Sequence, residues 1–95
     1  MSFLRFFRKK PETETSRLAR LAQAGRIADG AVIDVKVDDN RNITHIFYTY
    51  VIAGVEYESS QELSVEQKTE SSRYAPGTDI TIRYDPRQPG NSMVA

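Results

Sequence analysis

The spacing of apolar residues changes along this chain from a helical period to a strand-like period. Leu18, Leu21, Ala22 and Gly25 recur at i, i+3, i+4 and i+7, which predicts an amphipathic helix over residues 13–24 with one narrow apolar face. A helix this short is marginal in isolation, so we expect it to dock on its own domain or, less commonly, on a partner. The helix and a following linker then occupy residues 13–29.

From Gly30 the apolar residues alternate with polar ones. Ala31, Ile33, Val35 and Val37 share one parity, which predicts a half-buried strand with these four side chains toward the core. The segment Ile-Thr-His-Ile-Phe-Tyr-Thr-Tyr-Val-Ile over residues 43–52 carries apolar or aromatic groups on both parities. We therefore expect a central strand covered on both faces, with the helix over one of them.

Turn-forming residues separate the strands. Pro76-Gly77 suits a type II turn, because glycine supplies the positive φ at the third position. Further turns are predicted at residues 38–42, Ala53-Gly54, Asp85-Pro86 and Pro89-Gly90.

Two more strands follow from the same patterns, at residues 55–63 and 79–85, and residues 92–94 suit a short edge strand. The polar segment 64–75 can hold a turn or a short helix. The predicted fold is mainly β: a small curled antiparallel sheet or barrel of four to five strands over residues 30–95, with one short N-terminal helix.

Residues 74–86 resemble the C-terminal end of a bacterial family of small domains of unknown function. Their sequence is Tyr-Ala-Pro-Gly-Thr-Asp-Ile-Thr-Ile-Arg-Tyr-Asp-Pro, and Pro89 follows. The glycine before a valine-rich strand at 30–37 and the tyrosine-containing hairpin at 48–57 are similar to the rest of the family pattern. The resemblance implies an all-β domain, and it carries over no activity and no functional residue. Members often occur in short membrane proteins, but here a basic aromatic tail stands where a membrane helix is expected.

Composition removes several classes of function. The chain has 95 residues, 39% of them apolar, which predicts one domain with a small core. Cysteine is absent, so disulfides, thiolate metal sites and cysteine nucleophiles are excluded, and a single histidine, His45, excludes a histidine-rich metal cluster. We expect a soluble cytoplasmic protein with no cofactor, no metal and no enzymatic activity.

The net charge of zero hides an uneven distribution. Residues 1–26 hold seven basic and two acidic residues, a net charge of +5, whereas residues 27–95 hold six basic and eleven acidic residues, a net charge of −5. An acidic body argues against a dedicated nucleic-acid-binding domain. A basic tail on an acidic body favours attraction to an anionic surface, or a tail that folds back on its own domain.

The first twelve residues form a basic aromatic tail and supply the candidate contact residues. Aromatic rings favour the headgroup boundary of a membrane and bases favour an anionic leaflet, so this segment can contact the inner face of a membrane or a protein partner. The alternative is a frayed terminus, or one that packs its phenylalanines on its own domain. The candidates are Phe3, Leu4, Arg5, Phe6, Phe7, Arg8, Lys9 and Lys10.

Other candidate chemistry is weaker. His45 lacks an orienting carboxylate and a substrate cleft in any recognisable motif, so a structural or exposed histidine is favoured over a general base. The Asp38-Asp39-Asn40 cluster is too short for a calcium loop of the EF-hand type and is expected to be a hairpin turn. The glutamates at positions 56, 58, 62, 66 and 70 are expected on solvated faces.

A tyrosine-rich strand face is the basis of an alternative function. Aromatic side chains on a small barrel can stack the bases of single-stranded nucleic acid, although they more often form core and cross-strand pairs. The leading hypothesis remains a non-catalytic binding or interaction module. The aromatic residues concerned are Phe47, Tyr48, Tyr50, Tyr57 and Tyr84.

Overall fold

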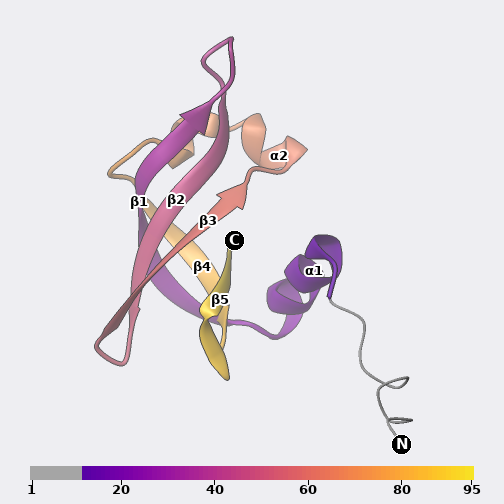
Figure 1. Cartoon of the computed structure of the whole chain (residues 1–95), viewed down its shortest axis with the longest axis vertical. Helices are drawn as coiled ribbons and strands as arrows, with labels where there is room; N and C mark the ends of the chain where they lie inside the picture. The colour runs from indigo at the N-terminus through magenta and orange to yellow at the C-terminus, as the bar shows by residue number, and fades with distance from the viewer. Residues whose placement is uncertain (1–11) are drawn as a thin grey trace, which may run out of the picture.

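Residues 12–95, which the computed structural model describes, form one antiparallel sheet and three short helical segments (Figure 1). Helix α1 precedes the sheet in the chain and lies beside β5 at its rim (Figure 1). In chain order the elements are α1 (Glu14–Ala24), β1 (Arg26–Val37), β2 (Ile43–Ile52), β3 (Val55–Glu62), α2 (Val65–Lys68), the 3-10 helix η2 (Ser71–Tyr74), β4 (Asp79–Asp85) and β5 (Gln88–Val94).

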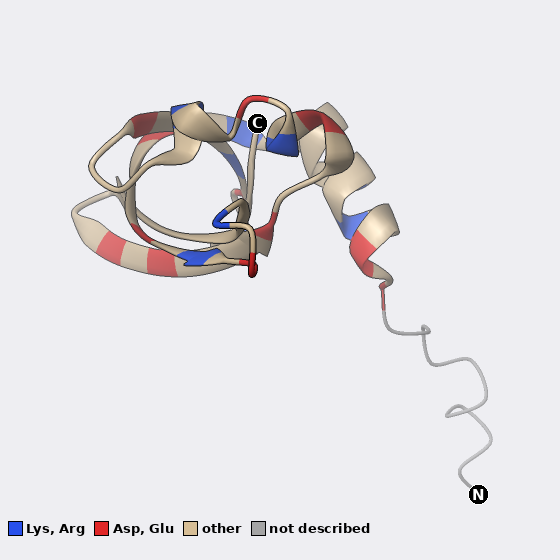
Figure 2. Ribbon diagram, turned by 90° about the horizontal axis from the view of Figure 1, so that it is seen from above, with Lys and Arg blue, Asp and Glu red and all other residues tan. Residues whose placement is uncertain are grey.

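The five strands are ordered β3-β2-β1-β4-β5 across the sheet, and each neighbouring pair is antiparallel. Seen from above, the sheet curls into a ring that brings the edge strands β3 and β5 together (Figure 2). Curling allows a small sheet to enclose a core with one of its two faces. The predicted class, a small curled antiparallel sheet with one short N-terminal helix, is confirmed.

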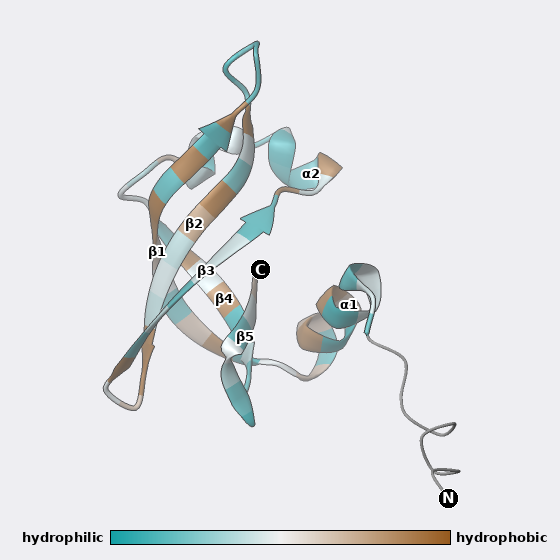
Figure 3. Ribbon diagram, viewed as in Figure 1, coloured by the Kyte–Doolittle hydropathy of each residue, from teal (hydrophilic) through white to brown (hydrophobic). Residues whose placement is uncertain are grey.

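The core lies inside the ring and draws on every strand except β3, together with two residues of the β3–β4 connection. Figure 3 shows that hydrophobic residues concentrate on β1, β2 and β4. The buried cluster consists of Val32, Ile46, Tyr48, Tyr50, Leu63, Tyr74, Ile80, Ile82 and Val94.

The predicted turns at Ala53-Gly54 and Pro76-Gly77 are confirmed. Ala53 and Gly54 have φ values of 51° and 81°, the double positive φ of the two-residue turn that matches strand twist in a hairpin. Gly77 has a φ of 89°, and the N–H of Thr78 donates to the carbonyl of Ala75 at 3.0 Å, as a type II turn requires. The Ala53-Gly54 turn joins β2 to β3 and sets their register, and the Pro76-Gly77 turn leads from η2 into β4.

The prediction that β2 is covered on both faces is wrong. Its inward residues Ile46, Tyr48 and Tyr50 are buried, whereas Phe47 and Val51 on the other face are 38% and 58% exposed. The physical reason is the closure of the sheet, which gives it one interior. Helix α1 packs on β4 and β5 and does not cover the outer face of β2.

Strand β1 begins at Arg26, four residues before the predicted start, and a bulge changes which residues face the core. Val32 is buried and opposite Tyr48, but the next pair is Asp34 with Phe47, so Ile33 is an extra residue in the strand. Ile33 is consequently 47% exposed, although its parity predicted burial. Val37, beyond a second irregularity between Lys36 and Val37, is 50% exposed and was also predicted to face the core. A bulge inserts one residue and reverses the alternation, which the apolar pattern alone does not reveal.

The predicted turn at Pro89-Gly90 is also wrong, because both residues lie within β5. The reversal occurs earlier, where the N–H of Arg87 donates to Oδ1 of Asp85 at 2.8 Å. Proline lacks the N–H needed for a central strand, but β5 is at the edge of the sheet and tolerates it. The edge strand therefore spans Gln88–Val94 and is longer than the predicted residues 92–94.

Candidate functional site

The residues predicted to contact a membrane or partner lie outside the described residues, which begin at Glu12. What the structure defines is the helix that directly follows them and the body to which it is attached. The predicted contact residues are Phe3, Leu4, Arg5, Phe6, Phe7, Arg8, Lys9 and Lys10.

Helix α1 docks on its own domain, as expected for so short a helix. Its start is capped by Thr13, whose Oγ1 accepts the N–H of Ser16 at 3.1 Å. Leu21 is 1% exposed and is the buried residue of the helix, which contacts β4 and β5. Burying one leucine side chain contributes about 2 kcal/mol, so polar contacts must share in holding the helix.

Gly25 allows the chain to turn sharply from α1 into β1. Its backbone is extended, with φ of −72°, and its N–H donates to the carbonyl oxygen of Leu21 at 2.8 Å. A Cβ at this position would lie 2.5 Å from that oxygen and 3.0 Å from Cβ of Arg83. Glycine is required here because the backbone of Leu21 and the side chain of Arg83 approach it closely, and not because the backbone is left-handed.

Arg17 connects α1 to the edge strand β5. Its Nη1 donates to Oδ1 of Asn91 at 2.7 Å and to the carbonyl oxygen of Ser92 at 2.8 Å. Its Nε and Nη2 donate to the carboxylate of Glu14 at 2.8 and 2.9 Å. These bonds lower the pKa of Glu14 and raise the pKa of Arg17, because each ion stabilises the charged form of the other.

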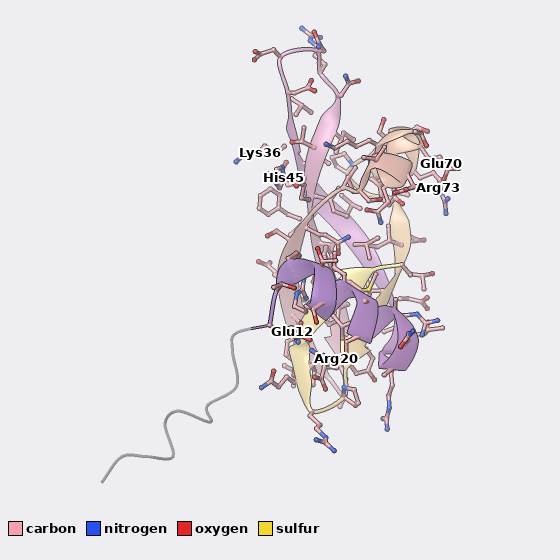
Figure 4. The ribbon with its side chains drawn as sticks, turned by 90° about the vertical axis from the view of Figure 1, so that its right-hand side faces the viewer. Glu12, Arg20, Lys36, His45, Glu70 and Arg73 are labelled. Atoms are coloured by element: carbon pink, nitrogen blue, oxygen red, sulfur yellow. The ribbon has the colours of Figure 1, made fainter. Side chains whose placement is uncertain are left out.

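Arg20 forms a second connection, one turn along the helix (Figure 4). It donates to both carboxylate oxygens of Glu12 at 2.9 and 3.0 Å and to Oδ2 of Asp85 at 3.2 Å. The bond to Arg20 lowers the pKa of Glu12, whereas the pKa of Asp85 is lowered first by the backbone N–H of Arg87 and then by Arg20. Arg17 and Arg20 are therefore paired within the molecule.

His45 lies on the outer face of β2 in a row of three charged or titratable side chains. It lies beside Lys36 on β1 (Figure 4). On its other side it is opposite Glu62 on β3, and its Nε2 is 3.9 Å from Oε2 of Glu62. Its Nδ1 is 2.9 Å from Oγ1 of Thr44. This open surface row lacks the enclosed substrate position that a general base needs.

The tyrosines do not form the external stacking platform that the alternative function requires. Tyr48 and Tyr50 are 0% and 2% exposed, and their rings stack inside the core at 5.9 Å between centroids. Tyr57 continues the stack at 5.5 Å from Tyr50, and Phe47 faces the opposite side of β2. Nucleic-acid bases cannot stack on buried rings, so this prediction loses its structural basis.

The loop between β1 and β2 is a hairpin turn, as predicted. Oδ1 of Asp38 accepts the backbone N–H groups of Asn40 and Asn42, each at 2.9 Å. This carboxylate therefore shapes the turn. Across residues 12–95, histidines, aspartates and glutamates do not gather into a group of three that could hold a metal ion.

The outer face of the sheet is acidic around an apolar centre. Ile33, Phe47 and Val51 are exposed there, and Glu56, Glu58 and Glu62 of β3 are exposed as expected for a solvated strand face. A shallow groove of about 440 Å³ crosses this face above Ala31. Its carboxylate-bearing lining residues are Asp29, Glu56 and Asp79.

No helix among the described residues is long and apolar enough to cross a membrane. Comparison with curated proteins and with solved structures found no match to this chain. A family model described as a domain of unknown function, DUF3592, matches residues 23–95, which include all five strands. The match leaves the tail and most of α1 outside it and covers more than three quarters of the chain, and the chain therefore belongs to the DUF3592 family.

Proposed function

We propose that this chain is a non-catalytic interaction module that attaches to an anionic membrane surface through residues 3–10. The observation that carries the proposal is the separation of charge between these residues and the folded body. Four bases and four apolar side chains lie directly ahead of α1, whereas residues 27–95 have a net charge of −5.

The docking of α1 supports this assignment of the binding segment. The apolar side of the helix packs on β4 and β5, and Arg17 and Arg20 are paired with groups of the same molecule. The helix therefore offers little apolar surface to a membrane or partner. The residues ahead of it supply the bases and aromatic rings that remain for binding.

The expected strength of membrane binding follows from the positive charge of residues 3–10. Each base near an anionic leaflet contributes about 1 kcal/mol, so four bases contribute about 4 kcal/mol, a factor of about 10³ in affinity. The aromatic rings add to this at the headgroup level. The attraction acts within a Debye length of about 8 Å at physiological salt, so binding is reversible and decreases as salt rises.

Co-sedimentation with lipid vesicles tests the proposal. The full chain should bind vesicles that contain phosphatidylglycerol and should bind vesicles of pure phosphatidylcholine much more weakly. The variant R5Q/R8Q/K9Q/K10Q should lose this preference. The matched control R41Q/K68Q/R73Q/R87Q removes four exposed bases from the body, none of them in the strand edge at residues 33–37, and should bind at least as well as the wild type.

Two results would overturn the proposal. One is equal binding to the two kinds of vesicle, and the other is binding that survives the four substitutions in the tail. A third outcome is that the chain binds no vesicles at low salt but binds a protein through residues 3–10. The binding partner would then be a protein and not a membrane.

A further inference from the structure

The C-terminal part of β1, residues 33–37, is paired with a neighbouring strand on one side only. Its ladder with β4 ends at the pair Ala31–Asp79, and the last bonds on that side join Val32 to Thr78 and Gly77. Beyond Val32, the strand continues to Val37 paired with β2 alone among the described elements. In Figure 1 this end of the β1–β2 hairpin projects beyond the rest of the sheet.

The free edge carries an exposed donor that is held by a local contact. The N–H of Val35 donates to Oδ1 of Asp34, the preceding residue, at 2.8 Å. Both partners lie at the surface, so this bond can exchange for another acceptor at little cost. Unpaired strand edges are templates for pairing with another strand.

The sequence of this edge complements itself. When two copies of the strand are placed antiparallel with a two-fold axis through Val35, Asp34 of each copy lies opposite Lys36 of the other. Val35 lies opposite its own equivalent, and the exposed Ile33 and Val37 lie toward the ends of the shared segment. Opposite charges directly across an antiparallel pair stabilise it, and like charges destabilise it.

We infer that two copies of this chain pair through the β1 edge, residues 33–37, in an antiparallel and two-fold symmetric arrangement. The N–H of Val35 then donates to the carbonyl of Val35 in the partner, and Asp34 exchanges its backbone contact for the partner's Lys36. The segment is short, so the dimer is weak and forms at high concentration. It also doubles the number of tails that one assembly presents to a surface, which raises avidity.

Sedimentation velocity of the full chain without lipid tests this inference. From about 10 µM to about 1 mM, the wild type should change from monomer to dimer. K36D places two aspartates opposite each other at both symmetric positions and should weaken the dimer at least about tenfold. The double variant D34K/K36D restores the opposite charges in reversed order and should recover dimerisation.

K68D is the matched control, because it makes the same change of charge on α2, which is not part of β1. It should dimerise like the wild type. A wild type that stays monomeric at the highest concentration overturns the inference, as does a K36D variant that dimerises normally or a K68D variant that does not.

Amide hydrogen exchange of the wild type gives a second readout that needs no variant. The amide of Val35 should become more protected as concentration rises, while core amides such as that of Ile46 keep their protection. Protection of Val35 that is independent of concentration contradicts pairing at this edge. The result does not depend on whether residues 3–10 bind a membrane.

Discussion

Oε1 of Gln61 on β3 accepts the backbone N–H of Val94 on β5 at 2.8 Å, across the point where the two edges of the sheet meet. Gln61 is 6% exposed, and β3 and β5 are not paired by a backbone ladder. Nearby, the Oη of Tyr50 donates to the carbonyl of Pro89 at 2.5 Å. Side chains therefore complete the ring where the backbone does not, and Gln61 satisfies an N–H of β5 that would otherwise be buried and unpaired.

Replacing Gln61 tests this closure. Gln61→Ala leaves the buried N–H of Val94 without an acceptor, so we expect the free energy of unfolding to fall by about 2–3 kcal/mol. Urea denaturation followed by circular dichroism measures the change. The control is Gln23→Ala on the exposed side of α1, which should change stability by less than about 0.5 kcal/mol. Equal effects of the two substitutions would contradict the closure by Gln61.

A second buried bond supports the same edge. The hydroxyl groups of Tyr48 and Ser92 are 2.7 Å apart, and both residues are buried. Tyr48→Phe should destabilise the chain by about 1–2 kcal/mol, because it leaves the hydroxyl of Ser92 unpaired. Adding Ser92→Ala should cost less than the sum of the two single changes. A double-mutant cycle of unfolding free energies measures the coupling, and strict additivity would refute it.

The contacts of Arg17 predict how α1 is held. Arg17→Gln removes the bonds to Ser92 and Glu14 and weakens the bond to Asn91, so α1 should loosen from β5. We expect amide exchange in α1 to accelerate about tenfold, while exchange in β2 stays unchanged. Arg20→Gln is the comparison, since its partners are exposed, and it should accelerate exchange less. The reverse order would show that Arg20 is the main attachment.

The carboxylates of this helix make its docking sensitive to acid. The pKa of Glu14 is below its ordinary value of 4.5 in the folded chain, because it accepts hydrogen bonds from Arg17. A lowered pKa favours the folded state above pH 4.5, and this contribution is lost as the pH falls through the lowered pKa. Carboxyl chemical shifts measured against pH should show the pKa of Glu14 returning toward 4.5 in Arg17→Gln.

Arg20→Gln is the internal control for the titration. It should raise the pKa of Glu12 and leave the pKa of Glu14 low, because each carboxylate has its own arginine. Asp85 should keep a lowered pKa in this variant, since its largest cause is the backbone N–H of Arg87. If Arg17→Gln leaves the titration of Glu14 unchanged, the hydrogen bonds do not control it.

The turn at residues 38–42 contains a strained residue. Arg41 has a φ of 64°, a left-handed conformation that costs a side chain with a Cβ about 1 kcal/mol or more. Arg41→Gly should therefore stabilise the chain by about 0.5–1 kcal/mol in thermal or urea unfolding. Asn40→Gly, at a neighbouring position without positive φ, should not stabilise it. Stabilisation by both substitutions would point to another cause.

Local patterns in the sequence predicted most of the fold. The helix over 13–24, the strand over 43–52 and the glycine turns at Gly54 and Gly77 depend on neighbouring residues, and the structure confirms them. The burial of Ile33 was predicted wrongly because a bulge depends on pairing with β2. The turn at Pro89-Gly90 was predicted wrongly because proline also suits an edge strand, and edge position is a property of the whole sheet.

The candidate site was less predictable. Charge along the sequence indicated the segment 3–10, but no local pattern indicated that Arg17 contacts Asn91 and Ser92, which are more than 70 positions away. Gln61 gave no signal either, because a polar residue in a strand usually faces solvent. Its role depends on the approach of β3 and β5, which only the closed sheet creates. Buried polar partners are tertiary features and require the fold.

The most direct test of the proposed function is the nuclear magnetic resonance spectrum of the full chain during a titration with phosphatidylglycerol vesicles at low salt. The proposal predicts that the amide signals of residues 3–10 broaden or shift first, that the buried core signals of Tyr48 and Ile46 keep their positions, and that added salt reverses the change. Unchanged signals from residues 3–10, with or without a response elsewhere in the chain, would contradict it.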